Sequence, residues 1–376
     1  MKILFVNLPY YGHVVPTIGL VQELIRQGCT VTYLMPFGWE ETVRESGAQF
    51  RGYPNHRQLS EQMKNAYAAA DAIAEAFDLI LYEQFFFLGK HLAQKHGKPA
   101  VRIFTAPATN EKLMQEYIHT KGPMSVFRHK WLCRAFTKDI AKEIPLKTDN
   151  WLDEILFNPP QLSLVYTLRE YQPDVEDFPE DQFLFLGPSV YERAPQSLDF
   201  EKTDRPVVYI SLGTVLKAPA SFFRTCIEAF RDAPVDVILS AGKSFGSRAL
   251  RKLPSNVHVY RTVPQTKVLE IADVFITHGG MNSVSEALVS STPMVVIPFV
   301  SDQPVNGRCV EKLGVGKVLD YGDVNAEVLH RTVMALLSDQ EVKRNLEAVH
   351  NMIRNAPGNR GAAQRIKQYG MQNDSR

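Results

Sequence analysis

Residues 272–303 carry side chains and backbone features that suit the binding of an anion. An apolar run at 274–277 is followed by the turn His-Gly-Gly at 278–280, and Asn282 and Ser283 come next, at the start of a helical pattern. Glycines allow positive φ and a close approach of the backbone to a ligand. The free N–H groups and the positive dipole end of a helix attract negative charge, and phosphate is the usual ligand. The stretch therefore predicts a phosphate-binding turn between a strand and a helix.

A second turn of this kind lies earlier in the chain. The sequence Ser-Leu-Gly-Thr at 211–214 ends the apolar run that begins at Val207. Ligands of open α/β sheets bind beyond the carboxyl ends of the strands, so two such turns in one domain would hold a diphosphate from both sides. The alternative is an ordinary turn without a ligand.

Four polar side chains of this region have both a functional and a structural interpretation. Ser283 and Glu286 have the S-x-x-E spacing of a capping box, in which Glu286 only caps its own helix; alternatively, Glu286 accepts hydrogen bonds from sugar hydroxyls. Asp302 and Gln303 either cap the next helix or bind vicinal hydroxyls of a sugar. His278 either contacts the ligand or satisfies nearby backbone groups. Spacing alone leaves these alternatives open.

His13 is the candidate for acid–base chemistry in the first half of the chain. It ends the sequence Tyr-Tyr-Gly-His at 10–13, which follows the apolar run 3–6 and precedes Pro16, a residue predicted to open a helix. A histidine at the ligand-binding edge of a sheet can serve as a general base near neutral pH. The alternative is a structural histidine. This loop has no Gly-x-Gly-x-x-Gly, which argues against a dinucleotide site.

Length and composition restrict the class of protein. A chain of 376 residues is long enough for two domains. The 42 basic and 41 acidic residues leave a net charge of +1, which argues against nucleic acid as the main partner. No apolar run is expected to be a signal peptide or a membrane span. The cysteines show no Cys-x-x-Cys spacing, which argues against a zinc site or disulfide framework and favours a cytoplasmic location.

The order of predicted elements indicates two tandem α/β domains with parallel sheets. The predicted boundaries are an N-terminal domain at 1–190, a linker at 191–205, a second domain at 206–357 and a last helix at 358–376 that packs back at the junction. Residues 110–158 are predicted to be irregular helices that cover one end of the first domain. The predicted strands are 3–6, 31–34, 78–81, 100–104, 162–167, 183–186, 207–211, 235–240, 257–260, 274–277 and 294–300.

Taken together, the motifs resemble the donor-binding signature of the inverting, nucleotide-sugar-dependent glycosyltransferases of family 1, in particular the bacterial macrolide and flavonoid type. The resemblance is carried by GHVVP, SLGT, VPQ, ADVFITHGGMNSVSEAL and PMVVIPFVSDQ, and it extends from residue 2 to about residue 365. It implies an α/β GT-B fold, with two Rossmann-like doubly wound domains facing across a cleft. The first domain would bind the acceptor and the second the donor.

The resemblance also implies roles for residues of the second domain. The diphosphate would contact Gly213, Thr214, His278, Gly280, Asn282 and Ser283. The nucleoside would contact Val263, Gln265 and Glu286, and the transferred sugar would contact Asp302 and Gln303. Thr262 stands where plant relatives usually have a tryptophan, which leaves the choice between UDP and dTDP open with uridine expected.

In the first domain, His13 matches the catalytic base of the family. The family has an aspartate after the strand that corresponds to 79–82, and this chain has Glu83 there, which we expect to orient His13. The segment 53–78 is shorter than in relatives and predicts an open acceptor site. This site would be lined by Tyr11, Phe85, Phe86 and Phe87, although the three consecutive phenylalanines are equally suited to the core.

The expected function is therefore transfer of a hexose, most simply glucose, from a UDP-sugar to a hydroxyl of a small aromatic, flavonoid or polyketide-like acceptor, with inversion. The chain has no Asp-x-Asp motif, and neither a metal nor another cofactor is expected. Two alternatives remain: a catalytically weak nucleotide-binding relative that assists a partner enzyme, and a nucleotide-sugar 2-epimerase of the same fold. The acceptor and the oligomeric state are left open.

Overall fold

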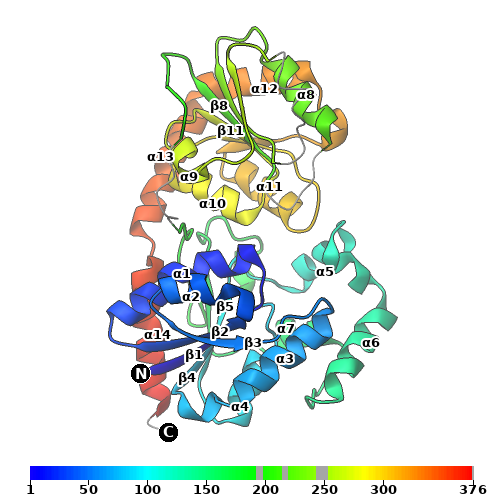
Figure 1. Ribbon diagram of the computed structural model, residues 1–376, viewed down its shortest axis with the longest axis vertical. Coiled ribbons are helices and arrows are strands. Elements are labelled where there is room, and N and C mark those ends of the chain that lie inside the picture. Colours follow the sequence, from blue (N-terminus) through cyan, green and yellow to red (C-terminus); the bar gives the residue numbers. More distant parts are fainter. Residues whose placement is uncertain (192–197, 214–218, 243–252, 375–376) are drawn as a thin grey trace. The chain divides into compact units, whose positions relative to one another are not determined.

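The structure, a computed structural model, describes residues 1–191, 198–213, 219–242 and 253–374. The chain divides into two compact units (Figure 1). Unit 1 comprises Met1–Tyr191 and Ala356–Arg376, and unit 2 comprises Glu192–Asn355. Over the described ranges, no helix combines the length and apolar character needed to cross a lipid bilayer.

Unit 1 is built on a parallel sheet with the strand order β3-β2-β1-β4-β5-β6-β7. Its two faces are both covered: alternate residues of β1, Leu4 and Val6, join one hydrophobic cluster, whereas Ile3 and Phe5 join the other. Burial on both faces explains why β1 is a continuous apolar run. The strands are β1 (Lys2–Val6), β2 (Thr30–Pro36), β3 (Gln49–Tyr53), β4 (Leu79–Glu83), β5 (Ala100–Phe104), β6 (Leu162–Val165) and β7 (Phe183–Phe185).

The helices of unit 1 divide between these two faces. Residues of α1 and α14 belong to one cluster, and residues of α3 to α7 belong to the other. The helices are α1 (Tyr11–Arg26), α2 (Glu40–Glu45), α3 (Leu59–Asp71), α4 (Gly89–Lys95), α5 (Glu111–His119), α6 (Lys130–Ala141), α7 (Trp151–Phe157) and α14 (Gly358–Asp374).

Unit 2 repeats the topology with the parallel strand order β10-β9-β8-β11-β12-β13. Its strands are β8 (Val207–Ser211), β9 (Asp236–Ser240), β10 (Val257–Tyr260), β11 (Val274–Thr277), β12 (Met294–Val296) and β13 (Gly316–Val318). Its helices are α8 (Ala220–Ala229), α9 (Gln265–Leu269), α10 (Met281–Val289), α11 (Gln303–Lys312), α12 (Ala326–Ser338) and α13 (Gln340–Asn355).

The sequence did not predict β3 and β13. Both lie at an edge of their sheet, where a strand pairs on one side and needs no continuous apolar run. In β3, exposed and half-buried residues alternate before the buried Tyr53. An edge position therefore explains the weak sequence signal.

The strand order reverses between β1 and β4 in unit 1 and between β8 and β11 in unit 2. In doubly wound sheets this switch point is where ligands bind, because the connections on its two sides leave in opposite directions. Glu83 is the last residue of β4, and the chain segments that follow β1, β8 and β11 contain His13, Gly213 and the turn at 278–280. The topology thus brings the predicted chemistry to the two switch points.

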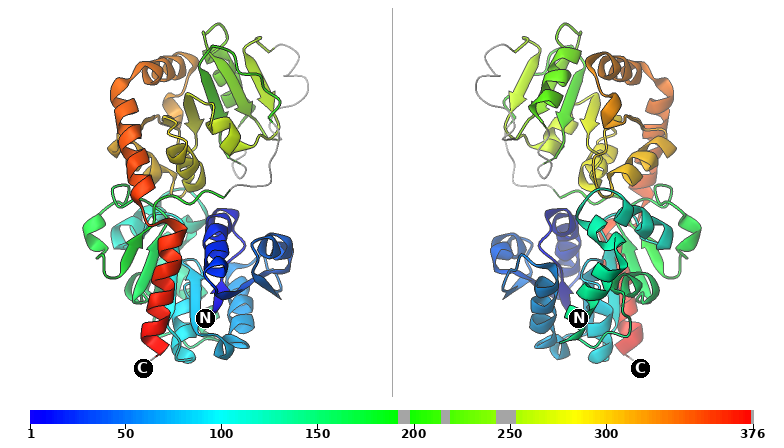
Figure 2. Two further views of the ribbon diagram at one scale, coloured as in Figure 1. Left: turned by 90° about the vertical axis from the view of Figure 1, so that its left-hand side faces the viewer. Right: turned by 90° about the vertical axis from the view of Figure 1, so that its right-hand side faces the viewer.

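The last helix returns to unit 1 after the chain has completed unit 2. Helix α14 packs on α1, and the left view of Figure 2 shows the red α14 beside the blue α1. Ala362, Ala363 and Ile366 are fully buried in the same cluster as α1. The Lys367 ammonium donates a 2.8 Å hydrogen bond to the backbone carbonyl of Gln27. Unit 1 is therefore discontinuous in sequence.

This packing predicts that Ile366→Ala destabilises unit 1 by roughly 2–5 kcal/mol, because a fully buried side chain is replaced by a cavity. Denaturant unfolding followed by intrinsic fluorescence measures the loss. Gln364→Ala, at an exposed position of the same helix, is the matched control and should change the free energy of unfolding little. Equal stability of both variants would contradict the described packing of α14.

Candidate active site

His13 and Glu83 lie in contact at the switch point of unit 1. Glu83 is the last residue of β4 and is fully buried, and its Oε1 lies 2.9 Å from His13 Nδ1. A carboxylate only accepts hydrogen bonds, so the proton of a neutral imidazole belongs on Nδ1. Nε2 is then the basic nitrogen, and 23% of the His13 side chain is exposed. This geometry suits proton abstraction from a bound molecule.

His13 lies in the first turn of a helix and not in the loop that the sequence predicted. Helix α1 begins at Tyr11, so Pro16 lies inside it and does not open it. The helical turn forms ahead of Pro16 because the N–H groups of His13 and Val14 both donate to the Tyr10 carbonyl. The helix therefore fixes the backbone from which the imidazole projects.

Asn7, which the sequence did not single out, holds this turn in place by hydrogen bonds from its side chain. Its side-chain NH2 donates to the His13 carbonyl at 2.9 Å and to the Tyr33 hydroxyl at 3.0 Å. Its Oδ1 accepts from the N–H of Leu8 at 2.7 Å. Asn7 is fully buried, so the network is shielded from water. Its place directly after an apolar strand was the feature of the sequence from which this role could have been inferred.

Two aromatic rings adjoin the imidazole. The Phe85 ring lies edge-on to His13 with the ring centroids 4.6 Å apart, and the Tyr10 ring lies 5.9 Å away. Burial, and then the negative charge of Glu83, raise the pKa of the Tyr10 hydroxyl, which stays protonated. Tyr11 is 44% exposed and its ring is tilted toward Trp39. Tyr10, which the sequence did not single out, therefore lies beside His13, whereas the ring of the predicted Tyr11 lies near Trp39.

The other two phenylalanines of the predicted acceptor wall are core residues. Phe86 is fully buried and Phe87 is 4% exposed, and both belong to the hydrophobic cluster of α3 to α7. Phe87 packs on the buried ring of Trp151. The core alternative left open by the sequence therefore describes Phe86 and Phe87, whereas Phe85 adjoins His13.

In unit 2, the His278 ring fills the space between two glycines. A methyl group on Gly213 would lie 2.7 Å from His278 Cε1, and one on Gly280 would lie 2.5 Å from Nε2. Burial lowers the pKa of His278 to about 4, so the ring is neutral at neutral pH. Its Nδ1 has no hydrogen-bond partner among the described residues. Thr214, also predicted for this turn, lies outside the described residues.

Glu286 does not act as a helix cap. Helix α10 is capped by Gly280, so Ser283 already lies inside the helix and the capping-box interpretation is wrong. Instead, the Gln265 side-chain NH2 donates to Glu286 Oε2 at 2.6 Å and to Ser283 Oγ at 3.1 Å. The Tyr209 hydroxyl donates to Gln265 Oε1 at 3.0 Å. Gln265, Ser283 and Glu286, three residues predicted to bind the sugar nucleotide, are thus joined in one polar cluster. Two other predicted residues are half-buried: Asn282 on the same helix, and Val263 two residues before Gln265.

Asp302 and Gln303 lie at the start of α11 and organise the loop before it. Gln303 Oε1 accepts from the N–H groups of Phe299 and Val300 at 2.8 and 3.0 Å. Asp302 Oδ2 accepts from Asn306, whose side-chain NH2 also donates to the Gly279 carbonyl at 2.8 Å. Asn306, missed from the sequence, therefore links this loop to the glycine turn.

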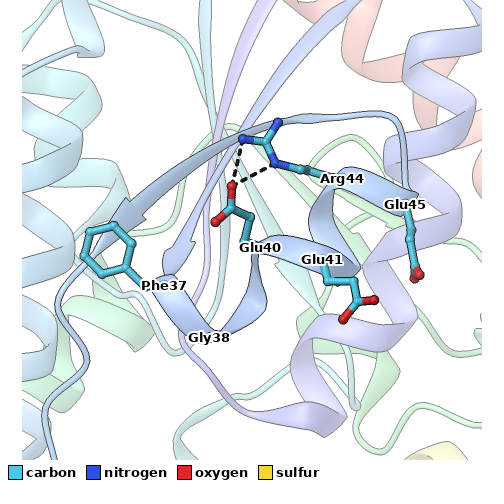
Figure 3. Close-up of a pocket in the computed structure, with 6 residues that line it drawn as sticks. All are labelled: Phe37, Gly38, Glu40, Glu41, Arg44 and Glu45. Carbon is cyan, nitrogen blue, oxygen red and sulfur yellow. Dashed lines mark hydrogen bonds and ion pairs between the residues drawn. The ribbon is translucent and has the colours of Figure 1, made fainter.

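A surface hollow of unit 1 contains none of the predicted residues. It is lined by Phe37, Gly38, Glu40, Glu41, Arg44 and Glu45, and Figure 3 shows the Arg44 guanidinium facing the Glu40 carboxylate. In the part of the chain that the structure describes, no group of three or more His, Cys, Asp or Glu side chains is arranged to hold a metal ion. We assign no function to the hollow.

The buried His278 predicts a pH dependence of stability. The pKa of His278 is about 4 in the folded chain and near 6.5 in the unfolded chain. Below pH 6.5 the unfolded chain therefore binds more protons, and the free energy of unfolding decreases as the pH is lowered. The loss between pH 7.5 and 5.0 should be about 2 kcal/mol from this residue. Denaturant unfolding at both pH values should show a smaller loss for His278→Gln than for the wild type. The exposed His350→Gln is the control, and an unchanged pH dependence in His278→Gln would contradict the burial argument.

Comparisons with known proteins show what this chain is similar to. A family model described as UDP-glucoronosyl and UDP-glucosyl transferase matches residues 171–359. NDP-glycosyltransferase YjiC of Bacillus subtilis (strain 168) is 32% identical over 385 residues, which cover 97% of this chain and 96% of YjiC. Among solved structures, the glycotransferase of kitacinnamycin has a TM-score of 0.82 and 30% identity, with 98% of each chain covered. CalG4, the calicheamicin glycosyltransferase, has a TM-score of 0.82 and 28% identity, also with 98% of each chain covered.

The likeness to these structures, together with the two parallel Rossmann-like sheets, confirms the predicted α/β GT-B fold class. The identity to YjiC spans nearly the whole of both chains, and the family model covers about half of this one. The chain belongs to the UDP-glucoronosyl and UDP-glucosyl transferase family and is a glycosyltransferase.

Proposed function

We propose that the protein is an inverting glycosyltransferase that moves a hexose, most simply glucose, from a UDP-sugar to a hydroxyl of a small aromatic, flavonoid or polyketide-like acceptor. The observation that carries this proposal is the 2.9 Å contact between the half-buried His13 imidazole and the buried Glu83 carboxylate. The acceptor class is supported by the solved relatives, which are glycosyltransferases of the natural products kitacinnamycin and calicheamicin.

On the acceptor side, His13 is the general base. Its Nε2 takes the proton of the acceptor hydroxyl while the oxygen attacks the anomeric carbon, and the bond from that carbon to the diphosphate breaks. Attack from the face opposite the leaving group inverts the configuration. Glu83 stabilises the imidazolium that forms and holds the ring in its tautomer. Phe85, Tyr10 and Tyr11 supply aromatic surface on which a flat acceptor can lie.

On the donor side, the glycine turn and the start of α10 bind the diphosphate. Backbone N–H groups and the helix dipole stabilise the negative charge that develops as the sugar leaves, and neither a metal nor a resident cofactor is required for that step. Neutral His278 donates a hydrogen bond to a phosphate oxygen. Gln265 and Glu286 bind the ribose, and Val263 adjoins the base. Asp302 and Gln303 bind the hydroxyls of the transferred sugar.

The direct test is a mass-spectrometric screen of UDP- and dTDP-sugars against a panel of phenols. We expect glucosylated phenol from UDP-glucose, with the β configuration by NMR. His13→Ala should lower kcat by roughly 10²–10⁴-fold because the general base is lost, and Glu83→Ala should also lower it. Incubation of the sugar nucleotide without acceptor detects an epimerase. Absence of any glycoside, an α product, or a wild-type rate in His13→Ala would contradict the proposal, and a wild-type rate in Glu83→Ala would contradict the role of Glu83.

The donor assignment predicts that Glu286→Ala weakens UDP binding by about 10- to 100-fold, because a hydrogen bond to a charged group contributes roughly 1.5–3 kcal/mol. Isothermal titration calorimetry measures this change. Glu270→Ala removes an exposed carboxylate from the end of the neighbouring helix α9 and should bind UDP normally. Normal UDP binding by Glu286→Ala would overturn the assignment.

A further inference from the structure

Thr105 contacts both members of the His13–Glu83 pair. It follows the last residue of β5, the strand that pairs with β4, so the sheet register brings it beside Glu83. Its hydroxyl oxygen lies 3.0 Å from His13 Nδ1 and 3.3 Å from Glu83 Oε1. The residue is 3% exposed, so water does not compete readily for the hydroxyl. The branched Cβ further restricts its rotation.

The hydrogen-bond donors around Glu83 fix the position of each proton. Glu83 Oε2 accepts from the N–H of Phe85 at 2.9 Å. Glu83 Oε1 lies close to both His13 Nδ1 and the Thr105 hydroxyl. If Nδ1 lacked a proton, its lone pair would face the carboxylate oxygen at 2.9 Å with no hydrogen between them. The consistent arrangement therefore has the Nδ1 proton directed at Glu83 and the Thr105 proton also donated to Oε1.

These hydrogen bonds restrain a side chain that is longer and more flexible than an aspartate. Its side chain has one more rotatable bond than an aspartate, and a buried carboxylate that is not hydrogen-bonded is strongly destabilising. The Phe85 N–H holds one carboxylate oxygen and the Thr105 hydroxyl holds the other. Together they restrain the carboxylate in the position from which it meets the imidazole.

We propose that Thr105 is a positioning residue for the reaction: its hydroxyl holds the Glu83 carboxylate so that His13 keeps its proton on Nδ1 and presents a basic Nε2. This inference rests on the proposed role of His13 as the base. Thr105 acts through Glu83 and His13, and not by touching the substrates.

The test compares Thr105→Val, which keeps the shape and lacks the hydroxyl, with Thr105→Ser, which keeps the hydroxyl. We expect kcat to fall about tenfold in Thr105→Val, with the KM for UDP-sugar unchanged, and to stay near wild type in Thr105→Ser. A tenfold fall corresponds to about 1.4 kcal/mol of transition-state stabilisation. Thr167→Val is the matched control, because Thr167 is 1% exposed and its hydroxyl has no hydrogen-bond partner among the described residues.

A second readout reports the tautomer directly. In ¹⁵N NMR of histidine-labelled protein, with the signal assigned through His13→Ala, the wild type should carry its proton on Nδ1. Thr105→Val should show a mixture of tautomers, and the apparent pKa in its pH profile of kcat/KM should differ from that of the wild type. Thr105→Ser and Thr167→Val should match the wild type in both measurements. Because the wild-type spectrum and its assignment do not depend on Thr105→Val, a wild-type proton on Nε2 overturns the inference even if Thr105→Val does not fold.

The remaining outcomes separate this inference from the proposed function. If His13→Ala is inactive but Thr105→Val has wild-type kcat and tautomer, the role of Thr105 is wrong and the role of His13 stands. If Thr105→Val raises only the KM for UDP-sugar, Thr105 acts on the donor and the inference also fails. If His13→Ala retains full activity, the proposed function fails.

Discussion

The buried carboxylate of Glu83 is the constraint on which the arrangement of unit 1 depends. A charge with no exposure to water is tolerated only where hydrogen-bond donors surround it. Here two donors come from distant parts of the chain, the start of α1 and the segment after β5, and the third is the backbone N–H of Phe85, two residues after Glu83. They meet because β1, β4 and β5 are neighbours in the sheet. A strand order that separated β4 from β1 and β5 would leave the carboxylate without His13 and Thr105.

The two units use one topology for two kinds of chemistry. At the switch point of unit 1, side chains form the site, and a histidine is held by a carboxylate. At the switch point of unit 2, backbone groups dominate, because the turn at 278–280 brings two glycines to the start of α10. The buried histidine of unit 2 is neutral and packs against Gly213 and Gly280. In the proposed reaction, the histidine of unit 1 accepts a proton and the histidine of unit 2 remains uncharged beside the diphosphate.

The local sequence does not determine the surroundings of Phe85, Phe86, Phe87 and Glu286. Phe85, Phe86 and Phe87 are chemically identical, but only the first adjoins His13, since the turn after β4 directs the next two rings into the core. Glu286 has the spacing of a capping residue, but the helix begins at Met281, two residues before Ser283, and Gln265 from α9 meets its carboxylate. In each case a contact from another element decided between interpretations that spacing left open.

The sequence by itself determined the α/β class, most strands, the glycine turns and the identity of the residues around both switch points. These features are local: apolar runs mark strands buried on both faces, and glycine followed by N-cap residue types marks a turn before a helix. The tertiary structure decided which of those residues meet. The contact of Thr105 with His13 and Glu83, the anchoring of the first turn of α1 by Asn7, and the return of α14 to unit 1 all depend on strand order and on packing between distant segments. Periodicity and spacing describe one element at a time, and the partners of a buried polar group are set by how the elements assemble.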